Sequence, residues 1–422
     1  MAASLVTVTV GAMVTAVGVS PAEAAWARAW KASPHGWTAT DSPRVSVDRQ
    51  GDALLTWTAC DSKASGCYHQ VQARVKPATK GAGPIRTLSP LGASASWPEA
   101  DSADNGDSAV VWEQDGHVAG RRVSASGQVI GPLRRLSTSA PAVGPVVAVA
   151  PGGMALAVWS EIRGGSWHAV ARRLSRTGAA GPVLTLGSGS AEKPAVGVDR
   201  QGRFVVAWVR GREVVTRRIL PGSVSPTRVL TAPIAAHGGF GMVRVGVDRD
   251  GDAVISYRSG GGARPAVWAS RWGRTGAPAR PLLISSGRDN VGFHHAVATD
   301  LEGDSMLVWT RWNGSRRLEM LGRRLTRTGA RGPVTALGLH DRPDLVLDDD
   351  GDGMLVFHSP SAPYKENRVG TRLISRSGAF GRITTLTSDG RVPQVDTRPN
   401  SRFTVVWQRT SYPYSIHATT GP

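Results

Sequence analysis

The sequence predicts an all-β protein in which eight four-stranded sheets form a closed ring, a β-propeller. Three observations predict this fold: a repeat of about 50 residues, short apolar segments of strand length within each repeat, and Asp/Gly turns between those segments. The 422-residue chain spreads 14 tryptophans along its length among Val-rich segments. This composition excludes a disordered chain, which would be poor in aromatic and β-branched residues.

One aromatic residue marks each repeat. These anchors are Trp57, Trp112, Trp159, Trp208, Tyr257, Trp309, Phe357 and Trp407. Fourteen residues before the anchor, six repeats have proline and the other two have Val243 and His295. Asp stands nine residues before five anchors, and Gly stands six residues before seven of them. The eight units therefore share the pattern P-x4-D-x2-G, a second Asp in five of them, and a final aromatic residue.

Each part of this pattern predicts one element of a blade. Proline opens the first strand, where a missing N–H costs least, and D-x-x-G forms the turn after it. The second strand, such as 204–208, is apolar at consecutive positions, which is typical of strands covered on both faces. A third strand carries arginine in a common register, and a fourth strand follows a turn such as 175–178. The arginines are Arg74, Arg122, Arg173, Arg218, Arg271, Arg324 and Arg372.

The last repeat ends without a fourth strand, so we expect an N-terminal strand to complete it and close the ring. Residues 36–40 stand where a fourth strand would precede the first proline. Residues 26–31 could instead supply the third strand of that blade, and the sequence leaves both possibilities open. Residues 25–422 are thus expected to form a single propeller domain.

The N-terminal segment has the features of a signal peptide, which predicts a secreted, extracellular protein. Residues 5–19 are largely apolar and uncharged, and Ala22-Glu23-Ala24 matches a signal-peptide cleavage site, so residues 1–24 are expected to be a signal peptide. No later stretch is long and apolar enough for a membrane span. In an oxidising compartment, the two cysteines, Cys60 and Cys67, are expected to form a disulfide across a short loop.

The repeats resemble the TolB-type repeats of secreted bacterial β-propeller proteins. The resemblance rests on the D-x-x-G turn before an aromatic-ended strand, as in residues 198–208, and covers nearly the whole of residues 25–422. The Ser-Pro of that turn, the Trp-Asp of WD40 blades, the paired glycines of kelch blades and the sialidase Asp box are absent. The resemblance therefore implies the fold but no particular function, because propellers include both binding scaffolds and enzymes.

Loops on one rim of the ring are the expected location of a functional site. Blades five and six replace the opening proline, and unusual loops precede them. We therefore predict a ligand site from their polar and aromatic residues, His237, Phe240, Arg288, Asp289, Phe293, His294 and His295. Trp167, Trp312 and Tyr364 lie in other loops of that rim, although simple tolerance of variation in loops would explain the same residues.

One D-x-x-G turn resembles a calcium-binding loop. Asp348, Asp350 and Asp352 match the first, third and fifth positions of an EF-hand loop, but Ser359 replaces the bidentate Glu at the twelfth. The alternative is that Asp348 only caps the turn. Apart from calcium at this turn, we expect no cofactor.

Charge and motifs together favour a binding protein. The net charge is +18, with 44 arginines and six lysines, which would attract polyanions. No nucleic-acid module appears, and no catalytic motif is recognisable. The first hypothesis is a monomeric, non-catalytic scaffold that binds an acidic polysaccharide, a cell-wall component or a protein. The alternative is a lyase or glycoside hydrolase of an acidic glycan, with a rim His or Tyr as base and Arg neutralising the substrate carboxylate.

Overall fold

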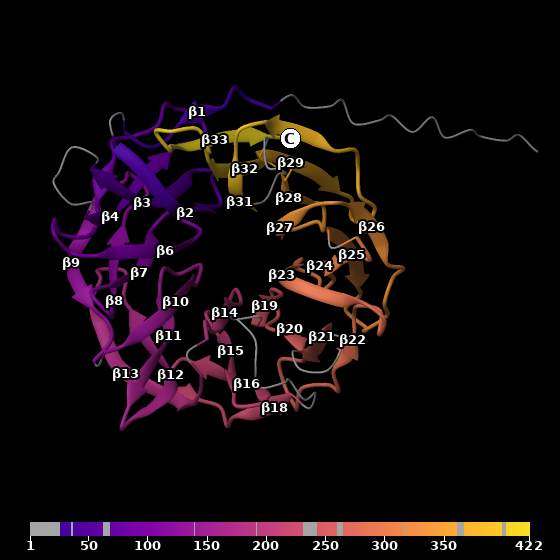
Figure 1. Ribbon diagram of the computed structural model, residues 1–422. Coiled ribbons are helices and arrows are strands. Elements are labelled where there is room, and N and C mark those ends of the chain that lie inside the picture. Colours follow the sequence, from indigo (N-terminus) through magenta and orange to yellow (C-terminus); the bar gives the residue numbers. More distant parts are fainter. Residues whose placement is uncertain are drawn as a thin grey trace, which may run out of the picture.

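The computed structural model describes residues 26–34, 37–61, 68–138, 140–190, 192–230, 243–259, 265–315, 317–360, 367–398 and 402–422. These residues form eight antiparallel sheets arranged as the blades of a ring around a central channel (Figure 1). The predicted all-β, eight-bladed propeller is therefore confirmed.

Each blade has its first strand at the channel and its last at the periphery. The first three blades contain β2 (Trp37–Val47), β3 (Ala53–Asp61), β4 (His69–Lys76) and β5 (Arg86–Thr87); β6 (Ala95–Ser102), β7 (Ser108–Gln114), β8 (His117–Val123) and β9 (Val129–Arg135); and β10 (Ala142–Val149), β11 (Ala155–Arg163), β12 (Ser166–Leu174) and β13 (Ala180–Ser188). The fourth contains β14 (Ala195–Val198), β15 (Phe204–Arg210) and β16 (Glu213–Leu220), with β17 (Ser223–Val224) and β18 (Arg228–Leu230) both paired to β16.

The other four blades follow the same order. They contain β19 (Val243–Val247), β20 (Ala253–Ser259), β21 (Ala266–Trp272) and β22 (Leu282–Leu283); β23 (Asn290–Thr299), β24 (Ser305–Trp312), β25 (Leu318–Leu325) and β26 (Thr335–Gly338); β27 (Asp341–Leu347), β28 (Gly353–Pro360), β29 (Asn367–Ile374) and β30 (Thr384–Thr387); and β31 (Arg391–Arg398), β32 (Arg402–Gln408), β33 (Ile416–Gly421) and β1 (Trp30–Lys31).

An N-terminal strand closes the ring, as predicted, but not by either of the two arrangements considered. β1 pairs with β33, with Trp30 opposite Ala418, and is the fourth strand of the last blade. The third strand is β33 itself. Residues 37–40 belong instead to β2, because this strand continues upstream of Pro43 through a bulge and pairs with β3 as far as Asp61. The choice of 36–40 as the closing strand was therefore wrong.

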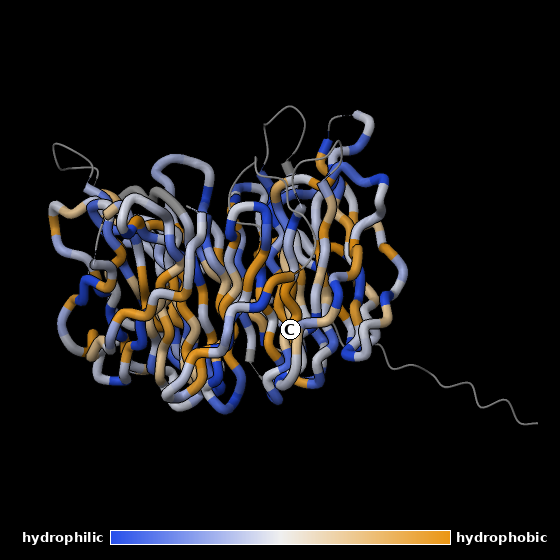
Figure 2. The backbone as a smooth tube through the Cα atoms, turned by 90° about the horizontal axis from the view of Figure 1, so that it is seen from below, coloured by the Kyte–Doolittle hydropathy of each residue, from blue (hydrophilic) through white to orange (hydrophobic). Residues whose placement is uncertain are grey.

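The hydrophobic core lies between neighbouring blades rather than in one central mass. Successive side chains of a strand point to opposite faces, so Trp112 of β7 packs toward the first blade and Val111 toward the third. The anchors Trp57, Trp112, Trp159 and Trp309 are completely buried. Figure 2 shows apolar segments in the middle layer and hydrophilic segments toward both faces of the ring. This packing explains the second strands without polar alternation.

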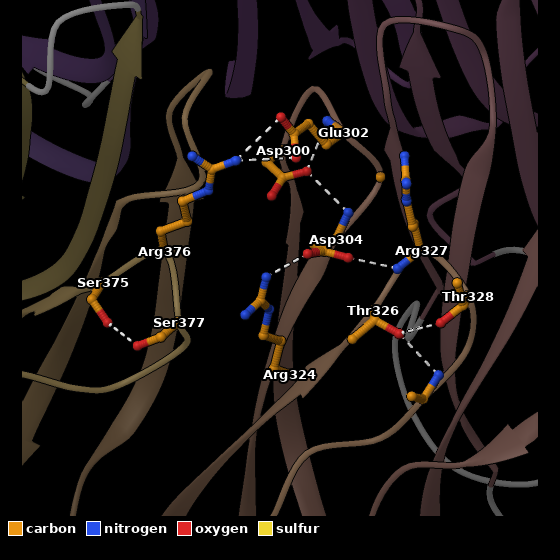
Figure 3. Close-up of polar contacts among 12 residues, drawn as sticks. Asp300, Glu302, Asp304, Arg324, Thr326, Arg327, Thr328, Ser375, Arg376 and Ser377 are labelled. Carbon is orange, nitrogen blue, oxygen red and sulfur yellow. Dashed lines mark hydrogen bonds and ion pairs between the residues drawn. The ribbon is translucent and has the colours of Figure 1, made fainter.

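The D-x-x-G turns of neighbouring blades pack against each other. In five blades one oxygen of the first Asp accepts the N–H groups two and four residues later, as Asp300 does from Glu302 and Asp304, both at 2.9 Å. Figure 3 shows this turn with its polar neighbours. The turn glycine of the following blade has positive φ, and a Cβ on Gly351 would lie 2.9 Å from the Asp300 carboxylate. The Asp residues therefore cap turns, which was the alternative to calcium binding.

The third-strand arginines form two rows rather than one register. Arg122, Arg173, Arg218, Arg271 and Arg324 pair with the residue three positions before the anchor, whereas Arg74 and Arg372 pair two positions before it. The first row reaches the next blade, as when Arg218 donates to the Gly251 carbonyl at 2.6 Å. In the second row, Arg74 reaches the previous blade, where it donates to the Ala32 carbonyl at 3.1 Å. Many arginines thus serve the contacts between blades.

Candidate functional site

The central channel has a hollow at each end. One hollow, of about 480 Å³, opens on the face that carries the D-x-x-G turns, which we call the turn face. The other, of about 460 Å³, opens on the opposite face, called the loop face. Residues of the innermost strands line both hollows, and Arg44, Glu99, Val147, Val196 and Gln394 border both of them.

Ion pairs bridge the channel between these hollows. Arg44 of the first blade makes a two-pronged contact with Glu99 of the second, with N–O distances of 2.9 and 2.8 Å. Lys193, which leads into the fourth blade, contacts the same carboxylate. Desolvation would raise the pKa of Glu99, but Arg44 and Lys193 outweigh it and lower the pKa to about 2. Glu99 is therefore ionised at neutral pH. Arg44 and Glu99, which border both hollows, form the charged inner end of the loop-face hollow, which we call its floor.

A recurrent bulge aims side chains into the loop-face hollow. Ser42, Trp97, Arg342 and Val392 each precede the opening proline and have φ between 49° and 51°. Non-glycine residues rarely adopt this region, and such strain is concentrated at functional sites. A bulge also re-aims the side chain that it carries. Side chains from this position line the hollow in five blades, namely Ser42, Lys193, His294, Arg342 and Val392.

We call Lys193, Arg244, His294, Arg342 and Asp344 the mouth site, because these charged or titratable residues line the loop-face hollow above its floor. Burial lowers the pKa of both Lys193 and Arg244. Burial raises the pKa of Asp344 to about 6, although its carboxylate accepts the Val395 N–H at 2.9 Å. The Arg342 side chain is exposed, and its guanidinium has no hydrogen bond or ion pair within the part of the chain that the structure describes.

Two histidines of β23 reach this hollow in different ways. His294 lies at its edge, where its Nδ1 is 2.7 Å from an oxygen of Asp341 on the next blade. The carboxylate can hold the ring with Nδ1 protonated and Nε2 free. His295 is buried, and burial together with nearby Arg244 lowers its pKa to about 3, so it stays neutral. His294 is therefore the histidine that is placed to act on a ligand.

The residues predicted from the loops before blades five and six fall into two places. Arg288, Asp289 and Trp312 line a separate surface hollow of about 790 Å³, which we call the outer hollow, whereas His294 and His295 line the channel mouth. Phe293 lies between them in sequence and is 49% exposed. Trp167 is half-buried on β12 of the third blade and lines neither hollow. His237, Phe240 and Tyr364 lie outside the described residues.

Calcium at the predicted turn stays a prediction. One oxygen of Asp348 accepts the N–H groups of Asp350 and Asp352, both at 3.0 Å, so this oxygen caps the turn. Across the described segments, His, Cys, Asp and Glu side chains nowhere gather in groups of three or more that could hold a metal ion. Cys60 is buried near the end of β3, and Cys67 lies outside the described residues, so the disulfide stays a prediction.

Sequence reasoning missed most of the mouth site, although the repeat contains a signal for it. The residue after the opening proline, or after its replacement, lines the loop-face hollow in most blades, and its chemistry changes from blade to blade. From the first blade to the eighth, the residues at this position are Arg44, Glu99, Val146, Ala195, Arg244, Ala296, Asp344 and Gln394. Four of these eight residues are charged, which indicates the channel as the place of chemistry.

Comparison with known proteins confirms the fold and assigns no family. No protein-family model matches the chain, and no curated protein resembles it in sequence. The solved Dos1 propeller aligns with 93% of this chain and 94% of its own at 8% identity and a TM-score of 0.57. The propeller domain of the Trilobed protease from Pyrococcus furiosus aligns with 84% of this chain and 96% of its own, at 7% identity and a TM-score of 0.48.

Endo-arabinase from Bacteroides thetaiotaomicron aligns with 54% of this chain and 92% of its own, at 15% identity and a TM-score of 0.34. At such identities the likeness concerns the fold alone. Within the described segments, no helix has the length and apolar character needed to cross a membrane.

Proposed function

We propose that this protein is a secreted binding scaffold that holds an acidic saccharide in the mouth site. The observation that carries the proposal is the convergence of Lys193, Arg244 and Arg342 from three blades on one hollow. Guanidinium groups bind carboxylates through paired, charge-assisted hydrogen bonds, and the exposed Arg342 is available for such a contact.

Saccharide binding is proposed because these cations lie together in one hollow, and not because the net charge of the chain is positive. Many other arginines donate to backbone carbonyls of neighbouring blades and are part of the scaffold, as Arg218 and Arg74 are. Trp97 occupies the same bulge position as Arg342 and is 50% exposed, but it does not line the hollow, so the mouth site offers cations as its main contacts. The carboxylate of an acidic sugar suits this group of cations.

Calorimetric titration with galacturonate tests this proposal. Arg342→Gln should weaken binding about tenfold, which corresponds to the loss of one charge-assisted contact. The matched control is Arg176→Gln, because Arg176 is also exposed but pairs with Asp107 on the turn face. Equal losses in both variants, or binding that disappears at high salt in every protein, would show mere charge attraction and contradict the proposal.

The extracellular location, the disulfide and the monomeric state belong to the same proposal. The apolar N-terminal segment followed by Ala22-Glu23-Ala24 supports export, and the short spacing of Cys60 and Cys67 supports their pairing. Mass spectrometry of protein recovered from culture medium should give a chain that begins at Ala25 and is two hydrogens lighter than the reduced form. Light scattering should give the mass of one chain.

A second candidate function is the cleavage of an acidic glycan, and the His294–Asp341 pair favours it. A histidine oriented by a carboxylate can act as a general base, and Arg342 beside it can neutralise a uronate carboxylate. Incubation with polygalacturonate should then release unsaturated products or new reducing ends, and His294→Gln should abolish the release. A wild-type protein that binds the polymer without releasing either product would leave the binding scaffold as the function.

A further inference from the structure

Among the described inner strands, β23 has the longest single bulge, at the point where it reaches the loop face. Val291 pairs with Arg311 of β24, and His295 pairs with Trp309. The chain thus advances by four residues on β23 but by only two on β24. In the second blade three steps, from Ser96 to Glu99, span two. The bulge of β23 therefore contains an additional residue, and Phe293 and His294 lie within it. A longer bulge displaces more side chains from the sheet.

This bulge joins the mouth site to the outer hollow. His294 lines the channel mouth, and Asn290 at the other end of the segment lines the outer hollow. Asn290 to His295 lie opposite three steps of β24, from Trp312 to Trp309, which cover roughly 10 Å. Phe293 lies between the two ends with half its surface exposed, and the Arg258 guanidinium sits 5.2 Å from its ring centre. Figure 1 shows β23 running from the blade toward the central channel.

The buried carboxylate of Asp289 fixes the segments that line the outer hollow. Asp289 is only 3% exposed, and its carboxylate accepts from Arg311 at 2.7 Å and from the Ser286 N–H at 3.0 Å. Arg311 also contacts Glu319. Trp312 follows Arg311 directly and is 39% exposed on the lining of the hollow. An aromatic ring on such a supported segment loses little conformational freedom when it binds a ligand.

We infer that the mouth site is the terminal subsite of an extended track along the β23 bulge, and that the ligand is an acidic oligosaccharide rather than a single sugar. This inference rests on the proposed function. The carboxylate of the terminal sugar lies among the cations of the mouth site. The following rings pack on Phe293 and then on Trp312, while Asn290 and Arg288 meet their hydroxyl and carboxylate groups.

The chemistry along the track favours a saccharide over an acidic peptide. Two exposed aromatic side chains, Phe293 and Trp312, occur on the same blade as the amide of Asn290 and the guanidinium of Arg311. Pyranose rings offer apolar C–H faces and a ring of hydrogen-bonding groups, so each sugar can use one aromatic face and one polar neighbour. Arg258 already covers part of Phe293, which leaves its exposed surface for one flat ring.

The test is the dependence of affinity on ligand length. Galacturonate and its linear hexamer are titrated calorimetrically into the full protein at fixed ionic strength. We expect the hexamer to bind at least tenfold more tightly than the monomer, because it adds aromatic contacts. Trp312→Ala should weaken hexamer binding about tenfold and leave monomer binding unchanged. Trp167→Ala, a tryptophan on the third blade outside the track, should change neither. Phe293→Ser provides a second variant at an exposed ring and should act as Trp312→Ala does.

Each result has a distinct meaning. Equal affinities of monomer and hexamer in the wild type would overturn the track and leave the mouth site intact. Absence of binding by both ligands would instead overturn the proposed function. Hexamer binding that is indifferent to Trp312→Ala and Phe293→Ser would also reject the track. A polyglutamate peptide that binds as tightly, with the same dependence on Trp312, would show that the ligand class is wrong.

Discussion

At the scale of single residues, arginine is the characteristic side chain of this scaffold. Arg172 donates through Nε to the Gly181 carbonyl of its own blade at 2.7 Å and through Nη1 to the Leu136 carbonyl of the previous blade at 3.2 Å. A planar guanidinium has several donors in fixed directions, whereas the lysine ammonium is a point charge on a flexible stem. One arginine can therefore join carbonyls of two blades, which gives the excess of arginine over lysine a structural reason.

Arg172→Ala should lower the free energy of unfolding by about 2 kcal/mol, because two carbonyls lose a charged donor. Arg176→Ala is the matched control four residues away. Its exposed pair with Asp107 should contribute less than about 0.5 kcal/mol. Urea denaturation of both variants measures the difference. Similar small losses in the two proteins would mean that Arg172 does not hold the two blades together.

Asp344 should make stability depend on pH. Its pKa in the folded protein is raised to about 6 by burial, whereas the unfolded chain has the ordinary value. The folded protein therefore binds more protons between about pH 4 and 6, and the contribution of this group to stability falls as the pH rises through that window. Asp344→Asn should stabilise the protein by about 2 kcal/mol at pH 7 and have no effect below about pH 4.

Thermal denaturation of the wild type and Asp344→Asn across this pH range checks the expectation. The amide oxygen can still accept the Val395 N–H, so the comparison isolates the charge. A constant difference between the two proteins at every pH would contradict the raised pKa.

At the scale of elements, the D-x-x-G turn is a joint between blades as well as a turn. Gly303 has φ of +90°, which favours glycine, and a Cβ there would lie 2.8 Å from the Asp248 carboxylate of the preceding blade. Its carbonyl accepts from Arg271 of that blade at 3.0 Å. The glycine of the repeat is thus required by its conformation and by its neighbour, which explains why seven of the eight repeats keep it.

Gly303→Ala should therefore destabilise the protein by about 2 kcal/mol, because alanine is strained at positive φ and meets a buried carboxylate. Gly81→Ala is the control, since a Cβ at Gly81 would have no atom within 4 Å and its φ is not in the positive region. That substitution should stay within about 0.5 kcal/mol of the wild type. Equal effects in guanidinium denaturation would refute the role of the turn as a joint.

At the scale of the whole molecule, closure of the ring depends on a short N-terminal segment. Ala27 and Ala32 donate their N–H groups to Thr420 and Ile416 at 2.9 and 2.8 Å. The Ala32 carbonyl accepts from Arg74 of the first blade, so this segment also links the last blade to the first. Without it, the edge of β33 would be open to pairing with another chain.

A chain that begins at residue 34 should consequently have a lower Tm than one that begins at residue 26, and it should aggregate on heating. Differential scanning calorimetry with light scattering measures both effects. If the two chains melted at the same temperature without aggregation, β1 would not be needed for closure.

The sequence predicted the blade correctly because its determinants are local. The opening proline, the capped turn and the buried aromatic residue act within about 20 residues, and their repetition gave the number of blades. The sequence places all seven arginines in one row, whereas Arg74 and Arg372 differ from the others by one residue in pairing, and only the strand register shows this difference. Adjacent strand residues face opposite neighbours, so this small shift changes the blade that is contacted.

Repeats in the amino-acid sequence are enough to predict the fold class, the eight blades and closure by an N-terminal strand. The segment that closes the ring and the meeting point of the charged residues follow from how the blades are arranged in space. Lys193, Arg244 and Arg342 are separated by 51 and 98 residues, and each occupies an ordinary position near the start of its own inner strand. They become neighbours because the blades are arranged around one axis. A site at the axis of a ring combines one residue from each of several repeats, so no single repeat contains its pattern.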